Sequence, residues 1–157
     1  MVLLPLVAEH VDLPIIAAGG ICDARSAAAA LALGAEGVQM GTRMLASREA
    51  GVHANFKEAI VAADDSGTVL LDIPGNPTMR VLRTGLASRV AADQTAGPLL
   101  GGVTTLYFDG DMEASVANTG QVSSRIVDIL PVAEVIRGTW EGAREALHAA
   151  AVRLGEP

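Results

Sequence analysis

Two glycine-containing dipeptides have the clearest chemical potential in this chain: Gly19-Gly20 and Gly41-Thr42. Each follows a short apolar run, so each is expected at the end of a β-strand. Glycine lets a backbone approach a ligand without a Cβ in the way, and successive exposed N–H groups form a nest for an anion. The Thr42 hydroxyl adds one more donor. The pattern predicts a phosphate-binding site, and it favours a phosphate monoester as the ligand.

A strand, a helix and a second strand are predicted to position these dipeptides. Residues 13–18 are apolar and rich in branched side chains, as in a parallel strand buried on both faces. Residues 25–33 are rich in alanine, with Asp23 placed to cap the helix and Gly34 placed to end it. Residues 37–40 then form the second strand. A right-handed crossover makes such strands parallel and brings their carboxyl ends to one edge.

The glycines could also have a purely structural role. Each dipeptide alone could serve only a tight turn or a bend, although two of them one strand–helix–strand step apart favour a binding site. A dinucleotide-binding Rossmann fold is disfavoured, because residues 19–24 lack the G-x-G-x-x-G spacing and no acidic residue closes the second strand. A (β/α)₈ barrel fits better, since such barrels frequently build a phosphate site from the loops after strands seven and eight.

The sequence from Leu13 to Arg43 resembles the C-terminal half of nitronate monooxygenases, formerly called 2-nitropropane dioxygenases, a family that includes flavin-dependent enoyl-ACP reductases. The segments LPIIAAGGI and ALALGAEGVQMGTR carry the likeness, which continues through a His-x-Asn-aromatic-Lys segment at 53–57 and reaches Gly120-Gln121. The resemblance implies an α/β fold: the C-terminal portion of an FMN-binding TIM (β/α)₈ barrel with its first strands missing. A complete barrel of this type needs about 250 residues, and the chain has 157.

The resemblance also implies an FMN-dependent oxidoreductase that oxidises alkyl nitronates with O2, with this chain as the half that binds the FMN phosphate. The alternatives are the enoyl-ACP reductase branch and a non-catalytic remnant or interaction module. The residues expected to bind FMN are Ala18, Gly19, Gly20, Met40, Gly41, Thr42 and Gln121. The family histidine that acts near the flavin falls in the part absent here, so no catalytic residue is assigned. The expected substrate is a small molecule, either a nitronate or an enoyl thioester.

The three histidines and the single cysteine are expected to have structural roles. His10 and His148 fall in predicted helices and are expected at the surface, whereas His53 is placed to pack against or cap the helix that follows it. Cys22 lies beside the start of a predicted helix and is expected to be a small buried side chain. These residues have no metal-ligand spacing, so no metal is expected.

Composition predicts a cytoplasmic globular protein. Mean hydropathy is +0.39, but charges interrupt every apolar run before the ~18 residues that a membrane span needs, and the start lacks a basic region and a cleavage site. A net charge of -7 disfavours nucleic acid as a partner. No repeat or linker divides residues 1–157, so one structural unit is expected. Strands cut from a barrel leave bare edges, which predicts a homo-oligomer or a complementing chain.

The second half of the chain has a less regular pattern. Its predicted elements are helices over 55–63, 122–130 and 133–154, a strand over 68–73, a strand or short helix over 79–83, and a loop over 97–104. The sequence Pro74-Gly75-Asn76-Pro77 is a strong turn signal that prevents the strand over 68–73 from continuing.

Overall fold

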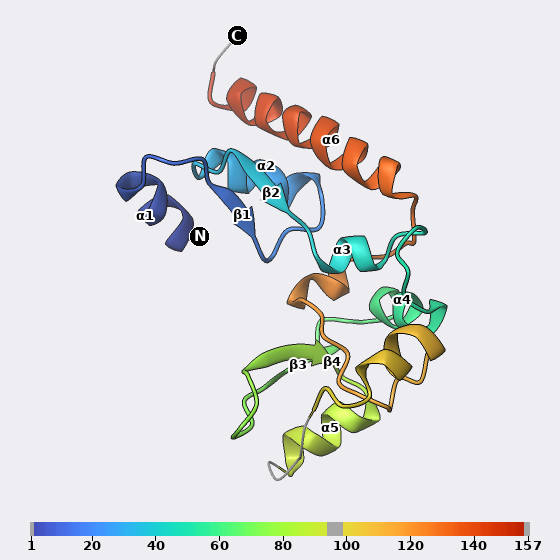
Figure 1. The fold of residues 1–157 in the computed structure, drawn as a ribbon. Coiled ribbons are helices and arrows are strands. Elements are labelled where there is room, and N and C mark those ends of the chain that lie inside the picture. The colour runs from blue at the N-terminus through green and yellow to red at the C-terminus, as the bar shows by residue number, and fades with distance from the viewer. Residues whose placement is uncertain (1, 94–98, 156–157) are drawn as a thin grey trace. The chain divides into compact units, whose positions relative to one another are not determined.

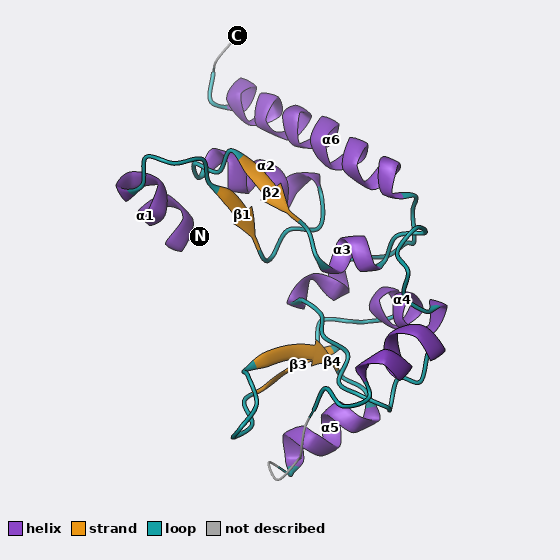
Figure 2. Ribbon diagram, viewed as in Figure 1, coloured by secondary structure: helices purple, strands orange, loops and turns teal. Residues whose placement is uncertain are grey.

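The structure is a computed structural model that describes residues 2–93 and 99–155. The chain divides into two compact units (Figures 1 and 2). Unit 1 consists of Met1–Met40 and Pro131–Pro157, and unit 2 consists of Gly41–Leu130. The expectation of a single structural unit over residues 1–157 stays a prediction.

Unit 1 contains the strand–helix–strand motif that the sequence predicts. After the helix α1 (Leu3–His10), the strands β1 (Ile16–Ala18) and β2 (Gly37–Gln39) pair in parallel. In this pairing Ile16 lies opposite Gly37. The helix α2 (Ala24–Ala32) connects the two strands (Figure 1). Both strands are shorter than the apolar runs that predicted them.

Both ends of α2 are set by the predicted residues. Asp23 is the N-cap, and its carboxylate accepts a hydrogen bond of 2.8 Å from the Ser26 N–H. The Ser26 hydroxyl in turn accepts from the Asp23 N–H at 3.1 Å, which completes a capping box. Gly34 follows the last turn with φ +102°, a left-handed conformation that favours glycine.

Helix packing forms the core of unit 1. The long helix α6 (Val132–Arg153) lies against α2, and the buried cluster consists of Ile21 and five alanines: Ala27, Ala28, Ala30, Ala35 and Ala143. The contact is close enough that a Cβ added to Gly142 would lie 2.7 Å from the Cβ of Ala24. The strand β1 does not share this burial, since Ile16 is 59% exposed. The prediction that this strand is buried on both faces is therefore wrong for the described chain, in which β1 pairs with β2 alone.

Unit 2 is built around an antiparallel strand pair. Its regular elements are α3 (Thr42–Leu45), α4 (Ala54–Val61), β3 (Thr68–Leu71), β4 (Met79–Leu82), α5 (Gly85–Ala92), the π-helix η1 (Thr105–Asp109) and the 3-10 helix η2 (Gln121–Arg125). In the strand pair Thr68 lies opposite Leu82 and Leu71 opposite Met79. The predicted turn at 74–77 joins the strands, and Gly75 has φ +80° there.

The strands of unit 2 bury larger side chains than those of unit 1. The core beside β3 and β4 contains Leu71, Ile73, Val81, Ala87, Val90, Leu99 and Val116. On α4, Phe56 is fully buried and meets Tyr107 edge to face, with ring centroids 5.2 Å apart. Unit 2 thus closes an apolar core within its own stretch of chain.

The second half of the chain departs from the predictions in several places. The helix expected over 122–130 is wrong beyond Arg125: residues 126–129 have no regular secondary structure, and Leu130 forms a β-bridge with Ser47 and accepts a hydrogen bond from the Arg48 N–H. The helices α3, α5 and η1 were not predicted from the sequence. In the loop expected over 97–104, residues 97–98 lie outside the described residues and 99–102 form turns. The C-terminal helix is confirmed by α6.

Candidate phosphate-binding site

The candidate site has two rims, which are the glycine-containing segments Gly19-Gly20 and Gly41-Thr42. The first rim is the turn after β1. Gly19 and Gly20 have φ +87° and +76°, so the backbone itself requires glycine at both positions. A Cβ added to either residue would meet nothing within 4 Å. The space beside the Cα atoms of this turn is therefore open to a ligand.

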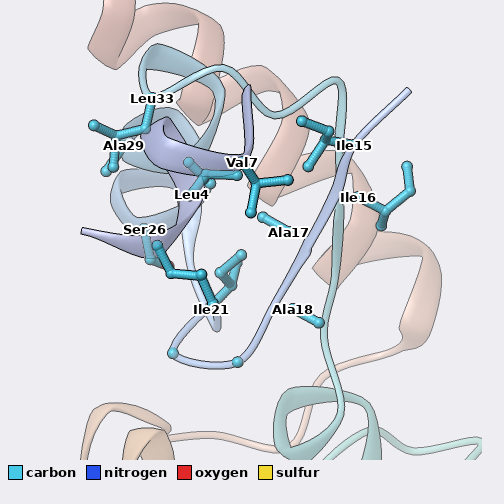
Figure 3. A pocket seen from close by; sticks show the side chains of 14 residues that line it. Leu4, Val7, Ile15, Ile16, Ala17, Ala18, Ile21, Ser26, Ala29 and Leu33 are labelled. Carbon is cyan, nitrogen blue, oxygen red and sulfur yellow. The ribbon is translucent and has the colours of Figure 1, made fainter. Parts of the chain in front are cut away.

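A cavity of about 590 Å3 lies beside this turn within unit 1 (Figure 3). Its walls come from α1, β1 and α2, and Gly19 and Gly20 stand at its rim. The side chains that line it are almost all apolar, including Leu4, Val7 and Ile21. The one polar side chain among them is Ser26, whose hydroxyl belongs to the α2 capping box. The cavity walls thus suit the apolar groups of a ligand, while the backbone polar groups that could contact it lie in the turn at Gly19-Gly20.

The second candidate rim begins unit 2. Gly41 has φ −91°, which any residue adopts, and a Cβ added to it would meet nothing within 4 Å. Neither the backbone nor packing among the described residues therefore requires glycine at this position. Gly41 precedes α3, and its carbonyl accepts from the Met44 N–H at 2.9 Å. Met40, the last residue of unit 1, has its sulfur 3.9 Å from the Thr139 hydroxyl of α6.

A hydroxyl network surrounds Thr42. The Thr42 Oγ1 accepts a hydrogen bond of 2.8 Å from the Gly120 N–H and lies 3.5 Å from the Thr119 hydroxyl. The Ser123 hydroxyl is fully buried and donates to the Gly120 carbonyl at 2.9 Å. The bond from the Gly120 N–H uses a lone pair of the Thr42 oxygen, so it does not use the Thr42 hydroxyl proton. This network places the exposed Gln121, the first residue of η2, beside Thr42.

The next residue, Arg43, forms an ion pair with Asp128. Its Nη1 donates to the Asp128 carboxylate at 2.9 Å and to the Asp128 carbonyl at 3.1 Å. The Arg43 side chain is 6% exposed and that of Asp128 is 47% exposed. Among the described residues, the buried Nη2 of Arg43 has no hydrogen-bond partner. In the sequence Arg43 stands out only as part of a motif, and Asp128 does not stand out at all. The two residues are 85 positions apart, so no local sequence pattern indicates that they pair.

The predicted FMN-binding residues fall into two groups. Ala18, Gly19, Gly20 and Met40 belong to unit 1, whereas Gly41, Thr42 and Gln121 belong to unit 2. Within unit 2 the structure brings Thr42 and the Gly120-Gln121 segment together. Their convergence with the turn of unit 1 on a single phosphate stays a prediction.

The histidines and the cysteine have the structural roles expected of them. His10 and His148 are exposed on helices, and Cys22 is buried. His53 caps α4, with its Nδ1 accepting from the Asn55 N–H at 3.1 Å. Its own backbone N–H donates to the carbonyl of Tyr107, a residue whose phenol has its pKa raised by burial.

Residues 2–93 and 99–155 contain neither a metal-ligand cluster nor a membrane-spanning helix. No group of three or more histidine, cysteine, aspartate and glutamate residues in that part of the chain could hold a metal ion. Over the same residues, no helix is both long enough and apolar enough to cross a membrane.

Comparisons with known proteins agree with the fold and the motifs. A probable nitronate monooxygenase of Staphylococcus haemolyticus is 40% identical over 73 residues, which are 46% of this chain and 20% of that protein. The solved structure of FabK from Thermotoga maritima matches with a TM-score of 0.87 and 38% identity, covering 97% of this chain and 51% of the other. The nitroalkane oxidase of Streptomyces ansochromogenes matches with a TM-score of 0.77 and 28% identity, covering 94% and 44%.

These matches place the chain in an α/β fold of the TIM-barrel type, of which it holds a part. The chain spans about half the length of the solved structures that it matches, and its matched segment is a fifth of the staphylococcal protein. The family model described as nitronate monooxygenase matches residues 1–141. Because that match covers most of the chain, including both glycine rims and the hydroxyl network, the chain belongs to the nitronate monooxygenase family.

Proposed function

We propose that this chain is the FMN phosphate-binding part of an FMN-dependent oxidoreductase that oxidises alkyl nitronates with O2. The observation that carries the proposal is Gly41, a glycine that neither backbone conformation nor packing among the described residues requires. A glycine free of both constraints leaves room for a ligand to approach the backbone closely, and Gly41 directly precedes the Thr42 hydroxyl. Family membership supports oxidoreductase chemistry.

The residues that would hold the phosphate offer neutral donors. Gly19, Gly20 and Gly41 would supply backbone N–H groups, and Thr42 would add its hydroxyl proton, while Ala18, Met40 and Gln121 would complete the surroundings. Such donors bind an anion even though the chain carries a net charge of -7. The flavin, when bound, supplies the redox chemistry, and the residues of this chain bind and orient it.

The alternative is the enoyl-ACP reductase branch of the same family, with an enoyl thioester as substrate. The similar solved structures include FabK as well as a nitroalkane oxidase, so both branches are worth testing. The cosubstrate separates them. A nitronate enzyme consumes O2 with nitronate and needs no nicotinamide, whereas a reductase oxidises NAD(P)H.

The proposed partner is a polypeptide that supplies the strands beside β1, either a complementing chain or a second copy. Leu13 and Ile16 are exposed, and the cavity beside β1 is apolar, so unit 1 presents a surface that another strand would cover.

The proposed location is the cytoplasm. A nucleic-acid partner is disfavoured by the acidic charge.

The first experiment is a titration of the purified chain with FMN, followed by flavin fluorescence, with riboflavin as the control that lacks the phosphate. Much tighter binding of FMN than of riboflavin is expected if the phosphate-binding residues act together. If a folded chain binds neither ligand, the interpretation as a non-catalytic remnant is supported and the proposal fails for this chain.

A matched pair of glycine variants tests the site itself. Gly41→Val places a branched side chain where the phosphate would approach, so we expect FMN binding to fall by at least tenfold, about 1.4 kcal/mol. Gly51 also lies in unit 2, and a Cβ added there meets nothing within 4 Å. Gly51→Val is therefore expected to leave binding unchanged. Equal effects from the two variants would refute the assignment of Gly41.

A further inference from the structure

The position of Gly41 and Thr42 cannot come from α3 itself. This helix has only four residues, Thr42–Leu45, and isolated helices shorter than about 12 residues are marginal in water. The backbone N–H groups of Gly41 and Thr42 must therefore be held by contacts with other segments of unit 2. Among the described residues, such contacts come from the stretch from residue 119 to residue 130, and two of them are short polar contacts of Thr42 and Arg43.

The first contact fixes the start of α3. The Thr42 hydroxyl accepts from the Gly120 N–H at 2.8 Å, and Ser123 holds Gly120 through its carbonyl at 2.9 Å. Both Thr42 and Ser123 are buried. This contact sets the Thr42 hydroxyl but leaves the rest of the short helix free to rotate about it.

The second contact prevents that rotation. Arg43 reaches Asp128 with one nitrogen, Nη1, which bonds to both the carboxylate and the carbonyl of that residue. The guanidinium is buried, and among the described residues its Nη2 has no partner and Asp128 supplies its ion pair. A buried charge whose partner is removed must move or be solvated. Loss of the Asp128 carboxylate would therefore displace Arg43 and, with it, α3.

The segment that carries Asp128 also holds the residues that follow α3. Its last residue, Leu130, accepts a hydrogen bond of 3.0 Å from the Arg48 N–H, and it pairs with Ser47 as a parallel bridge. Asp128 and Leu130 thus fasten residues 43 and 48 to one strand-like stretch. The orientation of α3 depends on that stretch rather than on its own hydrogen bonds.

We infer that Asp128, through its ion pair with Arg43, is a positioning residue that aims the Gly41-Thr42 donors at the FMN phosphate. This inference rests on the proposed function of the site. The positioning role and simple electrostatics predict opposite effects on FMN affinity when the Asp128 carboxylate is removed. Removing the carboxylate leaves an extra positive charge near a phosphate dianion, which by charge alone would strengthen binding, whereas loss of positioning weakens it.

The chain offers a matched control in a second ion pair of unit 2. Arg89 and Glu113 are joined at 3.1 Å, and Glu113 is 48% exposed, almost the same as Asp128. The difference lies in the arginine, because Arg89 is 67% exposed whereas Arg43 is buried beside Thr42. Glu113→Gln therefore removes an equivalent charge without touching α3.

The test measures FMN and riboflavin affinities of the wild-type chain, Asp128→Asn, Asp128→Glu and Glu113→Gln. We expect Asp128→Asn to weaken FMN binding by about tenfold while riboflavin affinity stays within about twofold. Asp128→Glu is expected to recover part of the loss, and Glu113→Gln to change neither affinity. Hydrogen–deuterium exchange over residues 41–48 should accelerate in Asp128→Asn and stay unchanged in Glu113→Gln.

Each outcome decides between the inference and the function on which it rests. A wild-type chain that prefers FMN, with an Asp128→Asn variant that keeps or increases the preference, overturns the positioning role alone. Equal losses for FMN and riboflavin overturn it as well, because they show a general defect of folding. A wild-type chain that does not distinguish FMN from riboflavin refutes the proposed function. If hydrogen–deuterium exchange over residues 41–48 is then also unchanged in Asp128→Asn, the claim that Asp128 positions α3 is refuted as well.

Discussion

The two units differ in how completely their strands are covered. In unit 2, the antiparallel strands β3 and β4 bury Leu71 and Val81, and the helix α5 packs beside them. In unit 1, the parallel strands β1 and β2 leave Ile16 exposed even though α2 and α6 pack together. Antiparallel pairs form from neighbouring segments and can be covered locally, whereas parallel sheets are stable when both faces are covered. The difference teaches that unit 2 covers its own strands and is the self-sufficient part, whereas among the described residues unit 1 leaves Ile16 of β1 uncovered.

The cores of the two units also differ in chemistry. The buried hydrophobic residues of unit 1 are mostly alanines, with Ile21, Cys22 and Val135 among them, whereas unit 2 buries many Leu, Ile, Val and Phe side chains. Because apolar burial stabilises by roughly 25 cal/mol per Å2, the larger side chains of unit 2 give it the greater share of the hydrophobic stabilisation. Unit 1 depends instead on the close approach of two helices. The two units can be followed separately, because the single tryptophan, Trp140, lies in unit 1 and the single tyrosine, Tyr107, in unit 2.

The largest expected effect is the loss of Phe56 from unit 2. Phe56→Ala removes a fully buried ring that contacts Tyr107, so we expect the free energy of unfolding of unit 2 to fall by about 3–5 kcal/mol. Urea unfolding followed by the near-ultraviolet circular dichroism of Tyr107 measures this change. Trp140 fluorescence, recorded on the same samples, reports unit 1.

The second phenylalanine provides the control, because Phe108 is 63% exposed. Phe108→Ala is expected to change the free energy of unfolding by no more than about 0.5 kcal/mol. If Phe56→Ala shifts the Trp140 transition as far as the Tyr107 transition, the two units unfold as one, and unit 2 is not self-sufficient in solution.

A smaller effect is expected where α2 and α6 meet in unit 1. Gly142→Ala would bring a Cβ within 2.7 Å of the Cβ of Ala24. Overpacking of this kind costs about 1–3 kcal/mol, partly offset by the ~0.5–1 kcal/mol that alanine gains over glycine in a helix. We expect a net destabilisation of about 1 kcal/mol, measured as a lower urea midpoint of the Trp140 transition.

Gly138, one turn earlier in α6, distinguishes helix propensity from packing. A Cβ there meets nothing within 4 Å, so Gly138→Ala should stabilise the helix by about 0.5–1 kcal/mol. The two alanine variants are thus expected to have opposite signs. Stabilisation by both would mean that α2 and α6 are not in close contact.

The smallest effect concerns an exposed turn of unit 2. Hydrogen bonds from the Ser66 hydroxyl and N–H hold the pKa of Asp64 below its ordinary value. The resulting stabilisation is present above the ordinary pKa and is lost as the pH falls through the lowered pKa. Ser66→Ala removes the hydroxyl, so the pKa of Asp64 should rise toward its ordinary value, as measured by NMR titration of the carboxyl carbon.

Ser88→Ala is a suitable control for this variant, because the Ser88 hydroxyl donates to the Thr84 carbonyl in α5. The Asp64 titration should not change in that protein. An unchanged titration in Ser66→Ala as well would show that the turn does not retain its hydroxyl contact in solution.

Local signals in the sequence were sufficient for most of the fold. Asp23 and Gly34 mark the two ends of α2, and the proline–glycine turn at 74–77 separates β3 from β4. The sequence alone indicates these features because capping and turn formation depend on neighbouring residues. The predicted helix over 122–130 fails because Leu130 pairs with Ser47 and Arg48, which lie far away in sequence. The burial predicted for β1 fails for a related reason: the pattern of residues 13–18 indicates a surrounded strand but cannot provide the neighbours.

The candidate site also combines features that the local sequence indicates with contacts that only the folded chain forms. Gly19 and Gly20 could be identified from the sequence, and their positive φ angles follow from the turn that they form. The sequence also singled out Thr42 and Gln121, but not the hydrogen bond that links Thr42 to Gly120. The pairing of Arg43 with Asp128 joins two positions with no periodic relation, so only the folded chain reveals it.

Unit 1 is assembled from two stretches of chain that are separated by the whole of unit 2. During synthesis, α2 leaves the ribosome long before α6, and residues are added at about 5–20 per second, so α2 waits on the order of ten seconds for its packing partner. Unit 2 can complete its core in that interval. In the nascent chain unit 2 is therefore complete while unit 1 is not, and the alanine face of α2 stays without its α6 partner until Ala143 is synthesised.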